Sequence, residues 1–214
     1  KGNIWGVISY GSSSSTRNVK YNTIIKEGED HAIHFYHGGA WNQNIIGNVI
    51  YHTTSSYLIY SYNPGGGEGV NIINNTFIST HASGDHIQVT AGGEYNIVNN
   101  IFYGGDNIIN STGEFGEFAF NDFYNSGSIF SGNSPDAYIG EYNFTNSNGI
   151  AMDLYNNMSE DPMFTDFEGG DYTLAEDSPC INAGDPNILD EYGIASDMGA
   201  LPEYCATEYD CNGI

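Results

Sequence analysis

An asparagine recurs at nearly constant spacing and constrains the fold more than any other feature of this sequence. The copies are Asn22, Asn48, Asn75, Asn100 and Asn121, which lie 26, 27, 25 and 21 residues apart. Each copy lies inside a short apolar segment. Repeats of this length are typical of solenoids, in which one repeat cannot bury its apolar face alone and therefore stacks on its neighbours.

A second short apolar segment follows each of these asparagines. The five segments cover residues 31–35, 57–60, 86–89, 107–109 and 128–130. Apolar and polar residues alternate in them, as in half-buried strands, and the Gly and Asn punctuation leaves no 3.6-residue period for a helix. Each coil is thus interpreted as a strand, an Asn-centred bend, a second strand and a Gly-rich turn. The predicted fold is all-β, a right-handed parallel β-helix (β-solenoid) of about six to seven coils with an irregular C-terminal cap.

Stacking of such coils assigns structural roles to the repeated residues. Successive coils would lie about 4.8 Å apart, so each strand pairs with the coils on both sides. Inward-facing side chains would form one apolar column; these are Ile24, Ile50, Phe77, Phe102 and Phe123. The five asparagines are expected to form a structural ladder, because Asn tolerates left-handed backbone and stacked amides bond to one another.

The charge balance is strongly acidic, with 27 Asp and Glu against four Lys and Arg, a net charge of −23. No Lys or Arg occurs after Lys26. Nucleic acid and anionic membranes are therefore excluded as expected partners, since both need basic residues. No apolar run reaches the roughly 18 residues that a membrane span requires, so membrane insertion is not expected. Such acidity favours solubility and the binding of divalent cations, which makes calcium a candidate cofactor.

Beside the repeat, which contains Ile-x-Asn-Asn-x-Phe in two coils, the last third carries a series of motifs: 161–164 (DPMF), 170–174 (GDYTL), 178–184 (SPCINAG) and 197–200 (DMGA). Together the repeat and these motifs resemble the pectin-lyase-like superfamily of parallel β-helices, in particular secreted bacterial β-helix repeat proteins. The resemblance implies a secreted or cell-surface protein. It also implies a β-helix over residues 1–202, with a capping segment from about residue 150. Residues 203–214 resemble the start of a Cys- and Asp-rich linker, so we expect the chain to be a processed piece of a longer polypeptide.

Members of this superfamily are often polysaccharide lyases or glycoside hydrolases, which raises the question of catalysis. A lyase needs a base and a positive group, and only Arg17, Lys20 and Lys26 could supply them. A glycoside hydrolase needs two carboxylates within about 5–9.5 Å. The catalytic candidates are Asp30, Asp85, Asp106 and His86, at or next to the start of the second strand. The alternative for each Asp is that it caps a turn through backbone amides.

Aromatic residues suggest a binding surface instead. Tyr57, Tyr60, Tyr62 and Trp41 are the candidate ligand-binding residues, since exposed rings stack on sugars and anchor protein interfaces. The alternative is a ladder of rings that only supports the helix. Candidate calcium ligands are Asp166, Glu168, Asp171 and Asp185, in an acidic region without the EF-hand pattern. Pairing among Cys180, Cys205 and Cys211 stays open.

The leading functional prediction is a non-catalytic extracellular module for adhesion, glycan contact or extracellular structure. Its partners would be extracellular polysaccharide or other surface proteins. One alternative is a polysaccharide lyase or glycoside hydrolase whose active site lies partly upstream of this chain. Another is a self-assembling fibre or sheath subunit, since an uncapped first coil exposes unpaired backbone groups.

Overall fold

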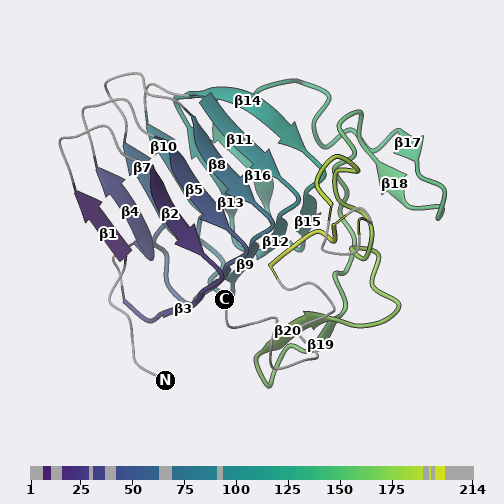
Figure 1. The fold of residues 1–214 in the computed structure, drawn as a ribbon, viewed down its shortest axis with the longest axis horizontal. Coiled ribbons are helices and arrows are strands. Elements are labelled where there is room, and N and C mark those ends of the chain that lie inside the picture. The colour runs from purple at the N-terminus through teal and green to yellow at the C-terminus, as the bar shows by residue number, and fades with distance from the viewer. Residues whose placement is uncertain are drawn as a thin grey trace.

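A computed structural model describes residues 7–10, 16–28, 31–36, 42–62, 69–90, 94–189, 193 and 196–200. Within these ranges the chain is all-β and winds into a parallel β-helix, so the predicted fold class is confirmed (Figure 1). The described residues contain no helix, and hence none long and apolar enough to cross a membrane.

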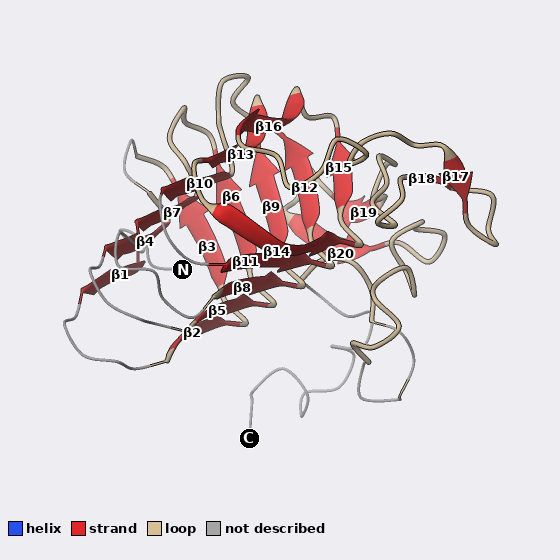
Figure 2. Cartoon of the chain, turned by 90° about the horizontal axis from the view of Figure 1, so that it is seen from above, coloured by secondary structure: helices blue, strands red, loops and turns tan. Residues whose placement is uncertain are grey.

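Three parallel sheets form the sides of the solenoid, as Figure 2 shows from above. Sheet A consists of β1 (Val7–Tyr10), β4 (Ile33–Tyr36), β7 (Ile59–Tyr62), β10 (Ile87–Thr90), β13 (Asn107–Ser111) and β16 (Ser128–Gly132). Sheet B consists of β2 (Arg17–Lys20), β5 (Gln43–Ile46), β8 (Val70–Ile73), β11 (Glu94–Val98) and β14 (Glu114–Ala119). Sheet C consists of β3 (Thr23–Lys26), β6 (Val49–His52), β9 (Thr76–Ser79), β12 (Ile101–Gly104) and β15 (Asp122–Tyr124).

Each coil contributes one strand to sheet B, one to sheet C and one to sheet A, in that order. The coils therefore have three strands where the sequence predicted two, because the bend at the asparagine separates strands in two different sheets. Among the described residues, five coils have a strand in all three sheets, and β1 precedes them in sheet A. The predicted count of six to seven coils is wrong, because after Gly132 the described strands pair antiparallel within the cap.

The bend between sheets B and C uses a left-handed residue in every coil. This residue is the one before the ladder asparagine: Tyr21, Gly47, Asn74, Asn99 and Phe120 have φ angles of 56°, 67°, 52°, 59° and 55°. The sequence analysis gave the left-handed conformation to the ladder asparagine itself, which is wrong by one position. At Gly47 a larger residue would also clash sterically, since a Cβ there would lie 2.5 Å from the Tyr21 ring.

The predicted apolar column is confirmed. Ile24, Ile50, Phe77, Phe102 and Phe123 are all buried and face the axis of the solenoid. The ring centroids of Phe77 and Phe102 are 4.9 Å apart, and those of Phe102 and Phe123 are 5.7 Å apart. The column continues through consecutive coils, so each ring is covered by the coils on both sides.

The cap follows the last solenoid strand and contains two antiparallel hairpins. They are formed by β17 (Phe144–Thr145) with β18 (Ala151–Met152) and by β19 (Phe164–Asp166) with β20 (Asp171–Leu174). Figure 1 shows both hairpins outside the three parallel sheets. Met158 pairs in parallel with Asp122, which adds one residue of a further coil to sheet C.

The last described segment, 196–200, binds the corner between sheets B and C. Asn74 donates through Nδ2 to the Asp197 carbonyl at 2.7 Å, and Asn99 donates to Ser196 Oγ at 2.8 Å. The Gly199 amide donates to the Asn99 carbonyl at 2.8 Å. The cap thus covers the side of the solenoid as well as extending its last coil. Residues 203–214 lie outside the described residues.

Candidate functional site

The asparagine ladder is the most regular polar feature of the molecule, and its role is structural. In each rung the side-chain Nδ2 and the backbone amide both donate to Oδ1 of the next asparagine, at 2.9–3.0 Å. The ladder continues beyond the prediction, because Asn121 donates in the same way to Asn157. Asn157 in turn donates to the buried carboxylate of Asp153.

A second ladder, which the sequence analysis missed, lies on the outer side of sheet B. Asn44, Asn71 and Asn96 each donate through Nδ2 to the asparagine of the preceding coil, beginning at Asn18, at 2.9–3.0 Å. These asparagines have the same spacing as those of the first ladder, so the second ladder could have been identified from the sequence by this spacing. The outer asparagines therefore support the solenoid and do not form a site.

The outer face of sheet A carries the predicted binding residues, in two columns set by the strand register. The first column, just before the strands, contains His31, Tyr57, Asp85 and Asn107. The second column, within the strands, contains His34, Tyr60, Gln88 and Asn110. The side chains of both columns are half-buried. On this face, two coils therefore present aromatic side chains, and the next two coils present carboxylate and amide side chains.

The rings of the first two coils pack into one cluster. His31 stacks on Tyr60 with centroids 4.8 Å apart and an interplanar angle of 14°. His34 meets Tyr60 edge-on at 4.8 Å, and Tyr57 lies 6.0 Å from His31. The sequence predicted the two tyrosines here but assigned neither histidine to this surface, because the register that aligns the columns is a property of the folded chain.

A hydrogen-bond network connects the rings to the polar coils. Asn110 donates through Nδ2 to the Tyr57 hydroxyl at 3.1 Å, across the intervening coil. The Tyr57 hydroxyl also bonds to the Asp85 side chain. Partial burial, followed by the Asp85 charge, raises the pKa of Tyr57, so the hydroxyl stays protonated as a donor. These contacts hold the Tyr57 side chain along the sheet.

The described catalytic candidates, Asp85, His86 and Asp106, lie in two adjacent coils and have different environments. Asp85 Oδ1 accepts the Asn107 backbone amide at 2.9 Å and Asn107 Nδ2 at 3.0 Å, which is the turn-capping role given as the alternative. Asp106 is exposed and precedes β13 one residue out of register with Asp85. His86 is buried in the solenoid at the corner before β10, next to the buried Ile87 and not on the outer face where Asp85 lies.

The remaining candidates on this side are outside the described residues. They are Asp30, Trp41 and the side chain of Tyr62, whose backbone ends β7. The register aligns His31 with Tyr57 and Asp85, one residue before the catalytic candidate His86. A shift of one residue exchanges the inner and outer faces of a strand.

The four candidate calcium ligands occupy two different places. Asp166, Glu168 and Asp171 are exposed on the hairpin of β19 and β20, where Asp166 and Asp171 accept backbone amides of the turn. Asp185 is buried, accepts Asn187 and donates its amide to Asn99. In the part of the chain that the structure describes, no group of three or more His, Cys, Asp or Glu residues could hold a metal ion.

Two buried histidines lie at the corner between sheets C and A. His52 and His86 have ring centroids 6.2 Å apart, and His86 Nε2 lies 2.9 Å from the Gly104 carbonyl. Burial lowers the pKa of His52 to about 3, with additional lowering by the charges of neighbouring His and Lys groups. Burial also lowers the pKa of His86 to about 4. Both rings are therefore neutral at physiological pH and belong to the core.

Comparison with protein-family models, with curated proteins and with solved structures gives no match for this chain. The fold of the molecule is a parallel β-helix. The resemblance to the pectin-lyase-like superfamily rests on the sequence motifs alone.

Proposed function

We propose that the protein is a non-catalytic extracellular module that contacts glycans through the outer face of sheet A. The observation that carries this proposal is the stacked pair of His31 and Tyr60, next to hydrogen-bonding groups on the following coils. Flat rings pack against the C–H face of a sugar, and neighbouring amides and carboxylates bond its hydroxyls.

The arrangement suits a linear glycan that runs along the solenoid axis. The two columns repeat once per coil, about 4.8 Å apart, so aromatic and polar groups follow one another in that direction. Tyr57 is already held by Asn110 and Asp85, and such preorganisation lowers the entropy cost of binding.

A binding role fits this face better than hydrolysis. Asp85 is engaged by a backbone amide, a side-chain amide and a tyrosine hydroxyl. Glycosidase chemistry needs a second carboxylate within about 5–9.5 Å that is free to act as an acid or a base. The other described candidate, Asp106, is exposed in the adjacent coil, one residue out of register with Asp85, so it is the contacts that engage Asp85 that favour binding.

The extracellular setting is supported by the strongly acidic composition and by the resemblance to secreted β-helix proteins. A net charge of −23 keeps a protein soluble and does not suit binding to anionic membranes. Extracellular polysaccharide is the proposed partner, and other surface proteins are the alternative ligand for the same rings.

Affinity electrophoresis through neutral and uronate polysaccharides tests the proposal. Tyr60→Ala should weaken retention by about tenfold, equivalent to about 1.4 kcal/mol, because it removes the central ring of the cluster. Tyr138→Ala is the matched control, since this tyrosine is exposed in the cap. Equal retention of the Tyr60→Ala variant and the unmodified protein on every polysaccharide that is bound would refute a role for this face.

The same polysaccharides distinguish binding from catalysis. Release of reducing ends or unsaturated sugars, abolished by Asp85→Ala, would identify the protein as an enzyme and overturn the non-catalytic proposal. Binding without turnover is the expected result.

Self-assembly is a second candidate that one observation favours. Strands β1, β2 and β3 lie at the edges of their sheets, and among the described residues no strand pairs with their outer edges. Such edges can pair with another copy. Light scattering that increases with concentration, together with filaments in electron micrographs, would support this candidate; a monomer at high concentration would exclude it.

A further inference from the structure

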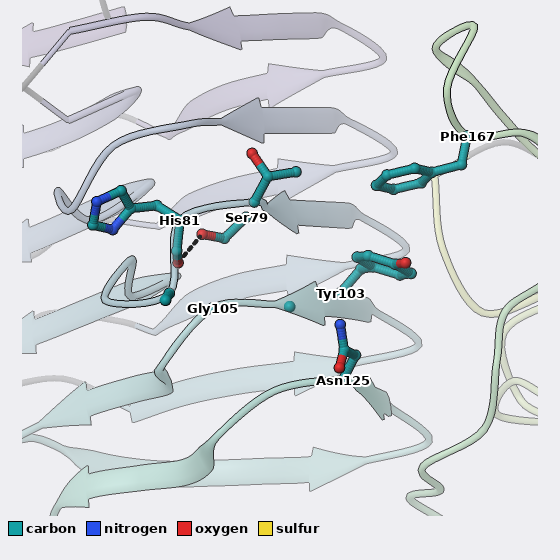
Figure 3. Close-up of a pocket in the computed structure, with 9 residues that line it drawn as sticks. Ser79, His81, Tyr103, Gly105, Asn125 and Phe167 are labelled. Carbon is teal, nitrogen blue, oxygen red and sulfur yellow. Dashed lines mark hydrogen bonds between the residues drawn. The ribbon is translucent and has the colours of Figure 1, made fainter.

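A hollow of about 460 Å³ lies on the sheet C side of the molecule, away from the outer face of sheet A. Figure 3 shows it between the ends of the sheet C strands and the loop that carries Phe167. The residues that line it include Ser79, His81, Tyr103, Asn125 and Phe167. A volume of this size is ordinary for a small-molecule site.

Two segments that are far apart in the sequence build its aromatic wall. Tyr103 comes from β12, and Phe167 comes from the turn between β19 and β20, with the ring centroids 4.7 Å apart. Phe164 and Tyr172 of the same hairpin pack behind Phe167 at 6.2 Å and 5.7 Å. The wall is therefore supported by a second layer of rings and does not depend on one exposed side chain.

The electrostatic environment of this wall is negative. Burial, then the charges of Asp161 and Glu168, raises the pKa of Tyr103. The same Glu168 charge contributes to the raised pKa of Tyr172, after burial and Tyr51. The sequence has no Lys or Arg after residue 26, so neither kind of side chain neutralises these carboxylates in the cap or the later coils, and His81 is the titratable base in the lining of the hollow.

We propose that the hollow binds a small organic cation, a ligand with a substituted ammonium group that lies against the Tyr103 and Phe167 rings. Ring faces attract cations through their quadrupole, and nearby carboxylates add to this attraction. A neutral ligand would gain only the apolar contact, and an anion would be repelled. The exposed amide group of Asn125 provides an acceptor for a polar substituent of the ligand.

This site is separate from the proposed glycan surface, because its wall belongs to β12 and the cap hairpin, whereas the glycan surface belongs to sheet A. A single chain could therefore contact a glycan and a cationic group at the same time. Failure of one proposal leaves the other standing, provided that each is tested with variants of its own face.

Choline and its neutral isostere 3,3-dimethylbutan-1-ol, titrated by calorimetry and NMR, test the charge requirement. Choline should bind in the millimolar range and the isostere should bind about 3- to 30-fold more weakly, the range of a cation–π contribution. Added salt should weaken choline binding and leave the isostere unaffected. Equal affinity for the two compounds, or no response to choline well above millimolar concentration, would overturn the proposal.

Two variants locate the site. Glu168→Gln removes an exposed charge without changing the packing, and Phe167→Leu removes one ring while keeping an apolar side chain. Both should weaken choline binding at least about threefold. Glu114→Gln on sheet B and Tyr60→Ala on sheet A are the matched controls and should leave it unchanged. If the controls weaken choline binding as much as the two site variants, the cation binds elsewhere and the assignment is wrong.

Discussion

The buried carboxyl of Asp122 should make the stability of the protein fall as pH rises toward 8. Asp122 is fully buried at the start of β15, where its Oδ1 accepts the Glu160 amide at 2.9 Å. The thiol of the buried Cys180 lies 3.6 Å from its Oδ2. Burial raises the pKa of Asp122 to about 8; the hydrogen bonds from the Glu160 amide and the Cys180 thiol oppose this rise, and the charges of Glu160 and Asp161 add to it.

The direction of the effect follows from the protons bound in each state. In the unfolded chain this carboxyl ionises near pH 4, whereas in the folded chain it stays protonated to about pH 8. Between these values the unfolded state binds one proton fewer. The free energy of unfolding therefore decreases by about 1.4 kcal/mol per pH unit through this group, and approaches a total of about 6 kcal/mol across the window.

Asp122→Asn should remove this dependence, because the amide has the same shape and does not ionise. Urea unfolding of the variant and the unmodified protein, between about pH 4.5 and 8, gives the difference in unfolding free energy at each pH. The variant should gain stability relative to the unmodified protein by about 1.4 kcal/mol for each unit of rising pH.

The change in net charge needs a control, since the chain carries 27 acidic residues. Asp106→Asn makes the same charge change at an exposed position and should give a difference that varies little with pH. If the Asp122→Asn difference is as flat as that of the control, Asp122 is ionised in the folded protein and the reasoning from burial is refuted.

Three further predictions concern the core and the bends. Asn100→Ala should lower the free energy of unfolding in urea by about 3–6 kcal/mol, because two buried donors of Asn75 lose their acceptor. Asn22→Ala, at the exposed end of the ladder, should lower it by about 1 kcal/mol or less. Equal losses for the two variants would contradict the ladder. As pH falls from 6.5 toward 4, the unfolded chain protonates its histidines while buried His86 stays neutral, so this group should lower stability by about 1.4 kcal/mol per pH unit. In acid titrations followed by circular dichroism, His86→Gln should lose this one contribution and keep that of His52, whose pKa is also lowered by burial; an unchanged slope would contradict a neutral, buried His86. Gly47→Ala should lower the melting temperature more than Gly149→Ala. Both positions have positive φ, but only at Gly47 would the added Cβ contact a ring, that of Tyr21. Similar decreases in melting temperature would show that the backbone conformation alone causes the loss.

The repeated asparagines and the apolar column could be identified from the sequence because consecutive coils repeat the same local pattern. Alternation along a short strand determines which side chains face inward, as Phe77 and Phe102 do. Asn75 and Asn100 recur once per coil, so stacking places one amide on the next. These features require only that neighbouring repeats lie on one another.

Other features depend on register and on contacts that no local pattern specifies. The left-handed residue at each bend is one position earlier than predicted, and only the register shows that His31 aligns with Tyr57 and Asp85 on the outer face of sheet A. The lengths of the loops between strands vary from coil to coil, and a difference of one residue exchanges the inner and outer faces.

The sequence by itself determined the solenoid, its inward-facing column and its asparagine ladder. Only the tertiary structure decided that the coils have three strands, that His31 stacks on Tyr60, and that the cap hairpin places Phe167 beside Tyr103. The physical reason is the range of the interactions. Stacking between adjacent coils repeats with the period of the sequence, whereas the contact between Tyr103 and Phe167 joins segments that share no period and meet only when the folded cap buries its own apolar residues against the solenoid.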